Sequence, residues 1–569
     1  MPHRRSLAQH LILAIALAIA GCTADAPREP VEVNLLALND FHGYLLPGNL
    51  TVEDAQGQRQ TIKAGGIAGI SGLLAWLRKE DPQTLFIGVG DLVGGSPPVS
   101  AMWADEPSLK AMDLMGMRLS VVGNHELDRG RTELERQIAG GCESSRPDKA
   151  CQFESHYAGI RFPYLAANLV DSRTGERLFP AYRIEEVQGV KIGFIGAVLE
   201  GVDAMISREA MQGLRTLDEA EAINGQVPAL LEQGVQAIVA VVHQGGTSAD
   251  TGEDPPCDDL RGDIVEVARR LDPRIKVMLS AHTHQRYLCQ VGDVLVTQGG
   301  AYGRLMTHVT LRIDPRAEAP VAVRARNLVV DPARYPADPA IAALADEVVA
   351  RSQVALERPL ARLGAREVPQ AVNEHGESPM GNLIADAQLA ATRPLGAQVA
   401  FMNEGGIRGG LALEPGQAQV NYGQVASVQP FNNGLTLLTL SGAELRELLE
   451  QQWRGDAFNP LQPSASFSYR WDPAQPVGQR IVPGSLRLDG QPIADGTDYR
   501  VAVNSFMADG GDNLAVLTRG RARLDTGLND LDVLIDHLQA HDRAGTPAGR
   551  SEAEGRVQRQ AGALAKGDH

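Results

Sequence analysis

The sequence is poor in cysteine, in aromatic residues and in positive charge. Only 5 of its 569 residues are cysteine, and 4% are aromatic. The 70 acidic residues outnumber the 53 basic ones, which leaves a formal net charge of −17. This balance disfavours nucleic-acid polymers and anionic lipid surfaces as partners, because both are bound through basic surface. It does not exclude a small phosphate ester, since a bound metal ion can reverse the local field.

One cysteine, Cys22, ends a segment that looks like a targeting signal. Basic residues at 3–5 precede an apolar run at 11–20 that is too short to span a bilayer. Residues 19–22, Ile-Ala-Gly-Cys, resemble a bacterial lipobox, so we predict that residues 1–22 are a lipoprotein signal peptide and that Cys22 is lipidated. Because Thr23, and not Asp, follows the cysteine, the resemblance points to a lipid-anchored protein of the cell envelope, at the outer membrane and facing the periplasm or the exterior. The alternatives are cleavage without lipidation and an uncleaved anchor.

The other four cysteines form two local pairs. An even number of cysteines suits an oxidising compartment. Cys142 and Cys151 lie within one short segment, and Cys257 and Cys289 within another. We therefore predict the disulfides Cys142–Cys151 and Cys257–Cys289. The alternative is four reduced structural thiols, which export of the chain disfavours.

Apolar runs of strand length alternate with segments of helical periodicity, which indicates an α/β fold with helices covering a sheet. We predict helices at 65–79, 108–115, 219–233 and 262–271, and strands at 33–38, 84–89, 119–122, 162–169, 190–197, 237–242 and 276–279. The composition then shifts to Pro, Ala and Arg, and an Ala-rich helix follows. The expected units are a first domain at 33–330, a linker helix at 336–358 and a second domain at 360–545. We expect the polar tail beyond about residue 545 to fray.

Seven side chains with oxygen or nitrogen donors each follow a predicted strand. They are Asp40, His42, Asp91, Asn124, His243, His282 and His284. In open α/β sheets ligands bind at the carboxyl ends of the strands. A donor set without sulfur suits Zn²⁺, Mn²⁺, Co²⁺ or Fe²⁺. Seven donors exceed the needs of one ion, so we predict two divalent ions ~3.5–4 Å apart that share the Asp91 carboxylate. The alternative is seven unrelated loop residues.

These motifs resemble the calcineurin-like metallophosphoesterases, and more closely the bacterial 5'-nucleotidase / UDP-sugar hydrolase family. The resemblance rests on Asp-x-His (40–42), Gly-Asp (90–91), Gly-Asn-His-Glu-x-Asp (123–128), the lone His243 and His-x-His (282–284). It implies an N-terminal layered αββα metallophosphoesterase domain, joined by the linker helix to a smaller α/β substrate-binding domain.

The resemblance also implies roles for these residues. One ion is held by Asp40, His42, Asp91 and His284, and the other by Asp91, Asn124, His243 and His282. His125, oriented by Asp128, contacts the phosphoryl group. Family members often have Gln or Asn at the position of His284, and a change to imidazole bears only on the choice of metal.

Two phenylalanines, Phe431 and Phe506, lie in loops rich in glycine and asparagine. Such a pair can sandwich a planar base; from the residues alone, two ordinary core aromatics is the alternative. In the resembling family the matching residues clamp the nucleobase. The further matches give Asn403 a contact with the base, Arg408 a grip on the phosphate and Asp512 a bond to the ribose hydroxyls.

The chain departs from the family at one place. Family members carry another phosphate-binding arginine a few residues before the Gly-Asn-Leu motif at 381–383. Here the neighbourhood, residues 373–377, reads Asn-Glu-His-Gly-Glu and holds no arginine. The grip on phosphate is therefore weaker or built differently, and the preferred length of the phosphate chain is open.

Together these observations predict a secreted metal-dependent enzyme that hydrolyses nucleoside 5'-phosphates to nucleoside and phosphate, with nucleotide sugars as further candidate substrates. The alternative within the family is a 2',3'-cyclic nucleotide phosphodiesterase or another two-metal esterase, such as one acting on a sulfur ester. A binding lipoprotein with incidental catalysis is a third reading, which the presence of Asp91, Asn124 and His125 disfavours. The expected partner is a small nucleotide, with membrane contact only through the lipid at Cys22.

Overall fold

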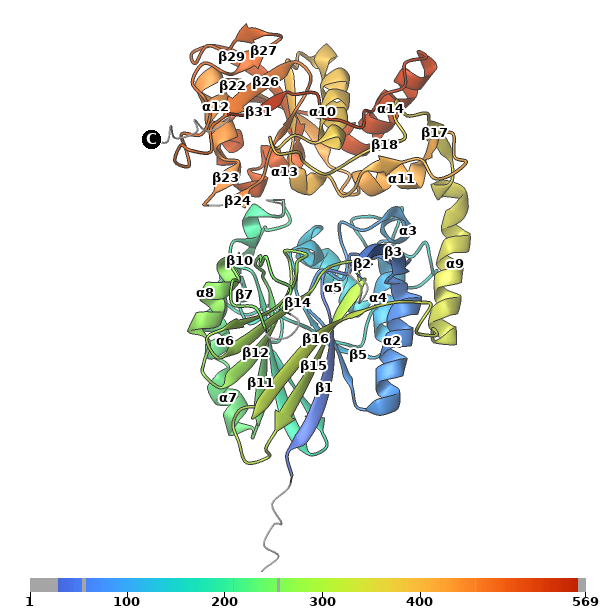
Figure 1. Cartoon of the computed structure of the whole chain (residues 1–569), viewed down its shortest axis with the longest axis vertical. Helices are drawn as coiled ribbons and strands as arrows, with labels where there is room; N and C mark the ends of the chain where they lie inside the picture. The colour runs from blue at the N-terminus through green and yellow to red at the C-terminus, as the bar shows by residue number, and fades with distance from the viewer. Residues whose placement is uncertain (1–28, 54–57, 208, 253–255, 456, 561–569) are drawn as a thin grey trace, which may run out of the picture.

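The computed structural model describes residues 29–53, 58–207, 209–252, 256–455 and 457–560. The predicted signal segment, with Cys22, lies outside these residues. The described chain forms an N-terminal and a C-terminal domain, and helix α9 (Pro339–Leu356) runs between them along one side of the molecule (Figure 1). None of the helices in the described ranges combines the length and the apolar composition that a bilayer crossing requires.

Two six-stranded sheets form the centre of the N-terminal domain. The first has the order β16 (Ala322–Val329), β15 (Leu305–Ile313), β1 (Val31–Leu38), β4 (Leu85–Gly88), β5 (Met117–Val121) and β6 (Tyr164–Leu165). The second has the order β13 (Arg286–Val291), β14 (Val294–Gly299), β12 (Ile275–Ser280), β11 (Ala237–His243), β9 (Val190–Val198) and β8 (Tyr182–Val187). Strands β1, β4, β5 and β6 of the first sheet run parallel, as do β9, β11, β12 and β14 of the second. Their carboxyl ends therefore meet at one edge of each sheet.

Alternation along the strands divides the apolar side chains between two cores. In β1, Val33 and Leu35 lie in the core between the two sheets, whereas Leu36 and Leu38 lie in the core on the helical side. The first sheet is covered by α2 (Gly66–Glu80), α4 (Glu106–Leu114) and α9, and the second by α6 (Glu219–Asn224), α7 (Val227–Glu232) and α8 (Asp263–Arg270). The layers are helix, sheet, sheet and helix, which confirms the predicted αββα fold.

Two predicted elements are each divided in the structure. The helix predicted at 219–233 is α6 followed by α7, because Pro228 stands in the first turn of the second helix and could not continue the first. The strand predicted at 162–169 is β6 followed by β7 (Leu169–Asp171). Between them, the Asn168 amide accepts from the Val198 N–H at 3.0 Å and donates to the Val198 carbonyl at 2.6 Å. A side chain thus takes the place of a backbone partner there.

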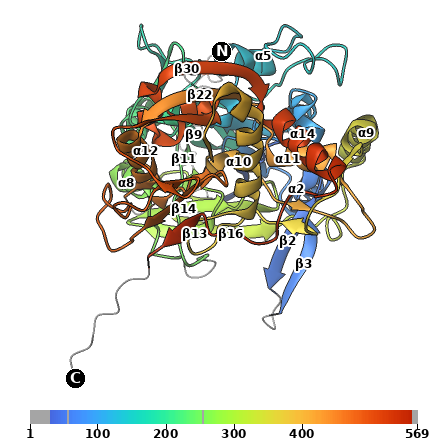
Figure 2. The same ribbon diagram turned by 90° about the horizontal axis from the view of Figure 1, so that it is seen from above.

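The C-terminal domain is also α/β. Its larger sheet has the order β25 (Gln462–Pro463), β19 (Val399–Met402), β29 (Asp498–Asn504), β22 (Gly434–Ser441) and β30 (Arg521–Asn529). A smaller one has the order β28 (Gln491–Pro492), β27 (Arg487–Leu488), β26 (Phe467–Trp471) and β31 (Val557–Arg559). The helices are α10 (Pro379–Thr392), α11 (Tyr422–Val428), α12 (Gly442–Glu450), α13 (Ser505–Ala508) and α14 (Asp530–Arg543). Seen from above, these elements lie over the N-terminal domain, from which the hairpin β2–β3 (Gly48–Glu53 and Arg59–Ala64) projects (Figure 2).

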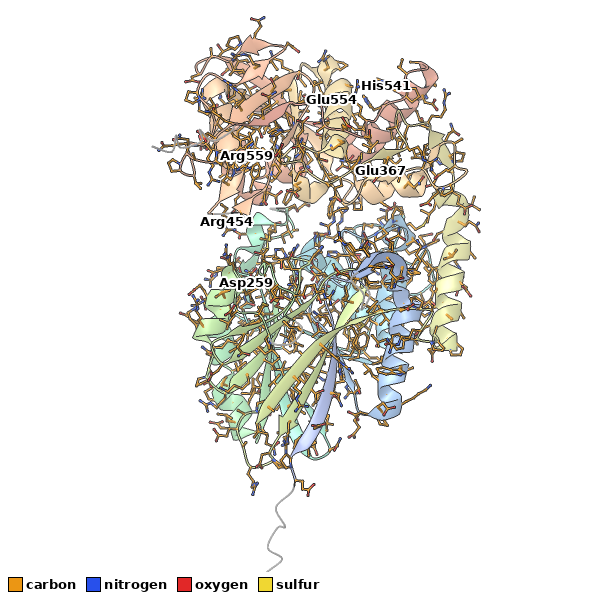
Figure 3. All side chains as sticks on the ribbon, viewed as in Figure 1. Asp259, Glu367, Arg454, His541, Glu554 and Arg559 are labelled. Atoms are coloured by element: carbon orange, nitrogen blue, oxygen red, sulfur yellow. A yellow bond between two sulfur atoms is a disulfide. The ribbon has the colours of Figure 1, made fainter. Side chains whose placement is uncertain are left out.

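The expectation of a frayed tail beyond residue 545 is wrong for the described residues, which reach 560. β31 pairs in parallel with β26, and Val557 is fully buried. Arg556, only 6% exposed, donates to Asp386 at 2.7 Å and also pairs with Glu554. Figure 3 labels Glu554 and Arg559 in this part of the domain. Arg550, Glu554 and Arg556 of this segment form ion pairs, while Val557 enters the core.

Both predicted disulfides are present. Cys142 is bonded to Cys151, and Cys257 is bonded to Cys289. The first closes the loop after α5 (Gly130–Ala139), and the second ties the segment after β11 to β13. The local-pair argument from the sequence is confirmed.

Candidate functional site

The seven predicted metal ligands come together at the carboxyl edge of the two sheets. Asp40 and His42 follow β1, Asp91 follows β4, Asn124 follows β5, His243 ends β11, and His282 and His284 follow β12. Both sheets are parallel around these strands, so their chain ends converge at one place although they lie far apart in the sequence. Five of the seven side chains are buried, His282 is half-buried, and His284 is 27% exposed.

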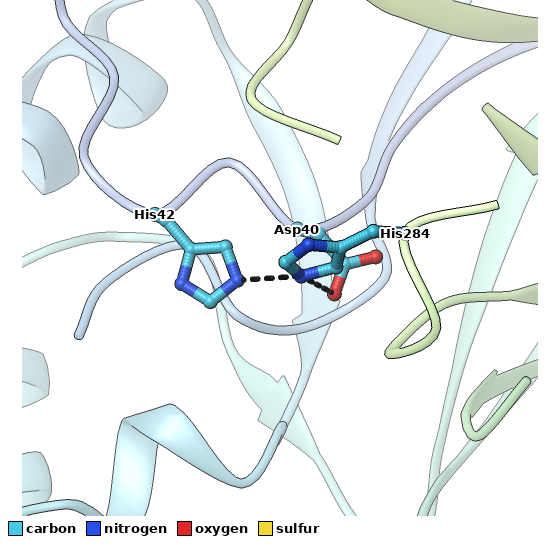
Figure 4. A group of neighbouring side chains, drawn as sticks. All are labelled: Asp40, His42 and His284. Atoms are coloured by element: carbon cyan, nitrogen blue, oxygen red, sulfur yellow. Dashed lines mark hydrogen bonds and ion pairs between the residues drawn. The ribbon is translucent and has the colours of Figure 1, made fainter. Parts of the chain in front are cut away.

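The first group of donors is Asp40, His42 and His284 (Figure 4). The Nε2 atoms of the two histidines are 3.1 Å apart, and Nε2 of His284 is 3.5 Å from Oδ1 of Asp40. Two imidazole nitrogens and a carboxylate oxygen that point at one another in this way could all bind a single cation.

The second group is Asn124, His243 and His282. The Asn124 Oδ1 atom is 3.2 Å from Nε2 of His243 and 3.0 Å from Nδ1 of His282. This group also contains no thiolate, and its donors are the nitrogen and oxygen types that first-row divalent metals accept.

Asp91 lies between the two groups. Its Oδ2 atom is 3.6 Å from Nε2 of His42 and 3.2 Å from Nε2 of His243. Its Oδ1 atom accepts a hydrogen bond from the backbone N–H of His125 at 2.9 Å. The placement is the one that a carboxylate shared by two ions requires.

The backbone is strained at most of these positions. Five of the seven have positive φ angles, namely Asp40 (48°), His42 (48°), Asp91 (50°), His282 (71°) and His284 (55°). Each such residue costs of order 1–3 kcal/mol when it is not glycine, and this strain concentrates at functional sites. Five strained residues that direct donor atoms to one place therefore support a binding centre over unrelated loop residues.

Two of the histidines are held by backbone carbonyls. Nδ1 of His42 is 2.7 Å from the Gly94 carbonyl, and Nδ1 of His243 is 2.8 Å from the Val89 carbonyl. A carbonyl can only accept, so each Nδ1 carries a proton and each Nε2 faces the centre, where it could bind a cation.

Glu126 supports the loops that carry the ligands, a role the sequence analysis did not assign. Its buried carboxylate accepts from the backbone N–H groups of Asp91 (2.8 Å), Leu92 (2.8 Å) and Gly123 (2.7 Å). These bonds join the end of β4 to the end of β5. The only sequence feature that could have indicated this role is the position of Glu126 inside the 123–128 motif.

The electrostatics suit a metal centre. Burial lowers the pKa of His282 to about 3, with the charge of His243 acting in the same direction. Burial, together with Arg408, also lowers the pKa of His284 to about 3. Both rings are neutral at pH 7, which leaves their lone pairs free for a cation, so the residues fit a divalent metal.

His125 and Asp128 form a pair at the border of this centre. Nδ1 of His125 is 3.0 Å from Oδ2 of Asp128, which fixes the ring and leaves Nε2 for another partner. Burial acts to lower the pKa of His125, but the carboxylates of Asp128 and Asp91 outweigh it and raise the pKa above its ordinary value. The imidazolium form is favoured, and it could stabilise or protonate an oxygen beside it.

A cavity of about 680 Å³ lies between the two domains and contains residues from both. The N-terminal domain contributes Asn124, His125, Asp128 and His282 to its lining, and the C-terminal domain contributes Asn403, Arg408, Phe431, Phe506 and Asp512. Every substrate-binding residue predicted from the sequence therefore lines the cavity that also reaches the candidate metal centre.

The two phenylalanines differ in their surroundings. Phe431 stacks on His125, with ring centroids 5.6 Å apart and planes 13° from parallel, and the Arg408 guanidinium lies 5.6 Å from its centroid. Phe506 lies against Gly511, where an added Cβ would approach its ring to 2.4 Å. The two rings do not touch each other in the described structure. Phe431 thus lies at the end of the cavity next to the candidate metal centre.

Polar groups accompany the aromatic ones. The Asn403 amide donates to Oδ2 of Asp512 at 2.7 Å and accepts from Asn504 at 2.9 Å. Burial raises the pKa of Asp512, and the Asn403 bond acts against this. Nη2 of Arg408 is buried and has no hydrogen-bond partner in the described structure. A buried guanidinium nitrogen without a partner is costly, and an anion in the cavity would relieve that cost.

The segment that lacks the family arginine forms a turn. The Asn373 carboxamide oxygen accepts from the N–H groups of His375 (2.9 Å) and Glu377 (3.0 Å). The residue closes this turn and contributes no charge to the cavity.

Comparison with known proteins places each domain. Residues 33–286 match the family model of calcineurin-like phosphoesterases, and residues 348–519 match that of the 5'-nucleotidase C-terminal domain. This chain is 31% identical to Endonuclease YhcR of Bacillus subtilis. The match covers 91% of this chain but only 40% of the length of YhcR.

Among solved structures, a 5'-nucleotidase precursor from Thermus thermophilus is similar, with a TM-score of 0.74 and 25% identity over 93% of this chain and 99% of that one. The fold is also that of the sulfate thiohydrolase SoxB from Thermus thermophilus, with a TM-score of 0.70 and 20% identity over 94% and 97% of the two chains. With its two domains matched in the same order, the chain belongs to the 5'-nucleotidase family of calcineurin-like, metal-dependent phosphoesterases.

Proposed function

We propose that this protein is a 5'-nucleotidase that hydrolyses nucleoside 5'-phosphates to nucleoside and phosphate, with two divalent ions at the seven-residue centre. The observation that carries the proposal is the shared cavity of about 680 Å³, which joins the metal end to the aromatic, polar end in one space large enough for a small ligand. Bound cations would supply Lewis-acid charge stabilisation and a lowered pKa for water at the phosphoryl group.

The protein's own residues divide the remaining work. Arg408 lines the cavity with its unpartnered Nη2 atom and can bind a phosphoryl oxygen, since a guanidinium pairs well with phosphate. His125, in the protonated form favoured by Asp128, is placed to donate a proton to the leaving oxygen. Phe506 and the Asn403–Asp512 pair lie where a base and a ribose would be held.

A substrate panel tests this proposal. The purified mature protein should release phosphate from nucleoside 5'-monophosphates, and removal of metal by a chelator should abolish the activity until Mn²⁺ or Zn²⁺ is returned. The panel should include nucleotide sugars, 2',3'-cyclic nucleotides and a thiosulfate ester. A clear preference for one of the last two classes over 5'-monophosphates would refute the proposed substrate.

We also propose that the protein is exported and held at the membrane by lipid on Cys22. The support is the lipobox-like sequence at 19–22, together with the two disulfides, which suit an oxidising compartment.

A further inference from the structure

We propose that His537 and His541 of α14 form a site for a divalent transition-metal ion, separate from the candidate metal centre between the domains. The two histidines are four residues apart on one helix, so their side chains lie on the same face, one turn apart. Figure 3 labels His541 in the part of the C-terminal domain that lies away from the N-terminal domain. The inference does not depend on the proposed function.

The spacing of the two rings fits a single ion. Their centroids are 4.4 Å apart, and their planes are 45° from parallel. An ion bound to one nitrogen of each ring at the ~2.0–2.1 Å typical of zinc would hold the centroids roughly 4.5–5 Å apart, for a bond angle at the ion between about 90° and the tetrahedral value. The observed separation is close to the lower of these values, so both rings can bind one ion with little movement.

His541 is held in place by the turn that follows α14. Its Nδ1 atom is 3.2 Å from the Thr546 carbonyl, and the Thr546 N–H donates to the His541 carbonyl at 3.1 Å. Since a carbonyl can only accept, Nδ1 carries a proton and Nε2 is the nitrogen that could bind an ion. A carbonyl behind the ring is a common support of metal-binding histidines.

His537 keeps unused binding capacity. Neither of its ring nitrogens has a hydrogen-bond partner among the described residues. Burial and the charge of His541 lower the pKa of His537 to about 4, while Asp386 acts in the opposite direction. The ring is therefore neutral at pH 7, and one of its nitrogens offers a lone pair.

Both rings line a cavity of about 1030 Å³ that α10, α14 and the segment 546–556 enclose. None of the described residues lines both this cavity and the nucleotide cavity. Two imidazoles leave further coordination positions of the ion to water, for which the cavity has room. Imidazole ligands suit Zn²⁺, Ni²⁺ and Cu²⁺, whereas Mg²⁺ and Ca²⁺ require oxygen ligands.

The charged groups of this cavity do not oppose a cation. Its lining has four carboxylates and three guanidiniums, those of Asp386, Asp489, Glu552, Glu554, Arg393, Arg550 and Arg556. Arg556 pairs with Asp386 and Glu554, and Arg550 pairs with Glu554. Among the described residues no ion pair involves Asp489, Glu552 or Arg393, which leaves two unpaired carboxylates against one guanidinium. His541 also lies in the last turn of α14, where the helix dipole favours a cation.

Calorimetry with Ni²⁺ tests the site in the full mature protein, after Zn²⁺ has been loaded into the candidate metal centre and the excess dialysed away. The unaltered protein should bind about one Ni²⁺ more than His537→Ala or His541→Ala. Each substitution should weaken this binding at least about tenfold, since even the outer partners of metal ligands are worth about 10–100-fold. His156→Ala is the matched control, because His156 is exposed and lies outside the cavity.

Thermal unfolding gives a second readout. Ni²⁺ should raise the Tm of the unaltered protein and of His156→Ala more than that of the two variants, because an ion bound only by the folded state stabilises it. Mg²⁺ should produce no such difference. Hydrolysis of p-nitrophenyl phosphate should be unchanged in both variants, which shows that they fold; if one does not fold, the other decides.

Unchanged Ni²⁺ binding in the folded variants would overturn the site. An equal loss in His156→Ala would also overturn it, because the uptake would then belong to surface histidines in general.

Discussion

Asp91 is the residue on which the proposed two-ion centre depends. It is 1% exposed, and one of its carboxylate oxygens faces a histidine from each group of ligands. We predict that Asp91→Ala abolishes hydrolysis, because both ions lose a common ligand. Elemental analysis should show less bound metal in this variant than in the unaltered protein. Full phosphatase activity in this variant, or in chelated protein, would contradict a metal-dependent reaction.

His125 is expected to act on the substrate and not on a metal. Its Nδ1 atom is taken by Asp128, and it stacks on Phe431. We predict that His125→Ala lowers kcat by ~10²–10⁴ while the metal content stays near that of the unaltered protein. Loss of an ion in this variant would identify His125 as a ligand and would remove the assigned role. Asp128→Asn should lower kcat by a smaller factor, because it disturbs only the orientation and charge of His125.

At the scale of elements, the loop after α11 and the short helix α13 after β29 each bring one phenylalanine to the cavity, and their roles should be separable. Phe506, in α13, has no ring contact with the catalytic pair among the described residues, whereas Phe431 stacks on His125. We predict that Phe506→Ala lowers kcat/KM for a nucleotide about 5- to 150-fold, the loss expected for one stacked base worth ~1–3 kcal/mol. With p-nitrophenyl phosphate, which has no base, the loss should be much smaller.

Phe431→Ala provides the contrast, because it should also reduce the rate on p-nitrophenyl phosphate through His125. Equal losses on both substrates in Phe506→Ala would mean that Phe506 is an ordinary packing residue. The assignment of a nucleotide would then lose its main support.

The strand β31 should contribute to the stability of the C-terminal domain. Arg556 is nearly buried and pairs with Asp386 and Glu554. We predict that Arg556→Ala lowers the free energy of unfolding by ~3 kcal/mol, the size expected when a buried ion pair loses one partner. Denaturant unfolding would measure it. Arg550→Ala is the control, since Arg550 is 75% exposed and its pair with Glu554 is worth little; equal effects would contradict a packed tail.

At the scale of the whole molecule, the site depends on how the domains meet. Ile341, Leu344 and Val348 of α9 belong to the core on the helical side of the first sheet, and Trp103 donates to Ser352 at 3.0 Å. Helix α9 is therefore packed on the N-terminal domain along its length. The chain passes to the C-terminal domain only after Leu356, so the geometry of the cavity depends on the few residues there and on contacts such as Arg129 to Phe431.

The location of the whole protein gives a further prediction. Cys22→Ser should move the protein from the membrane fraction to the soluble periplasmic fraction, because the proposed lipid is its anchor. Fractionation with an antibody against the mature chain would measure this. An unchanged distribution would contradict lipidation at Cys22.

The αββα layering was implied by the family resemblance. The sequence alone determined the alternation of strands and helices, both disulfides and the convergence of the seven donors. These features depend on local order: apolar runs of strand length, donors placed directly after them, and cysteines close together in the chain. Parallel strands of one sheet align their carboxyl ends whatever the length of the connections, so Asp40 and Asp91 could be expected at one edge from their positions alone. The packing of the second sheet on the first then brings His284 to Asp40.

Only the tertiary structure decided the contacts between distant segments. The role of Glu126 became visible once β4 and β5 were adjacent, and the stacking of Phe431 on His125 required the two domains to meet. The pairing of β31 with β26 joins Val557 to Tyr469, far apart in the chain, and its polar sequence carries no pattern that predicts it. Such contacts are set by the packing of whole sheets and domains, and a residue's own neighbours in the chain contain no record of them.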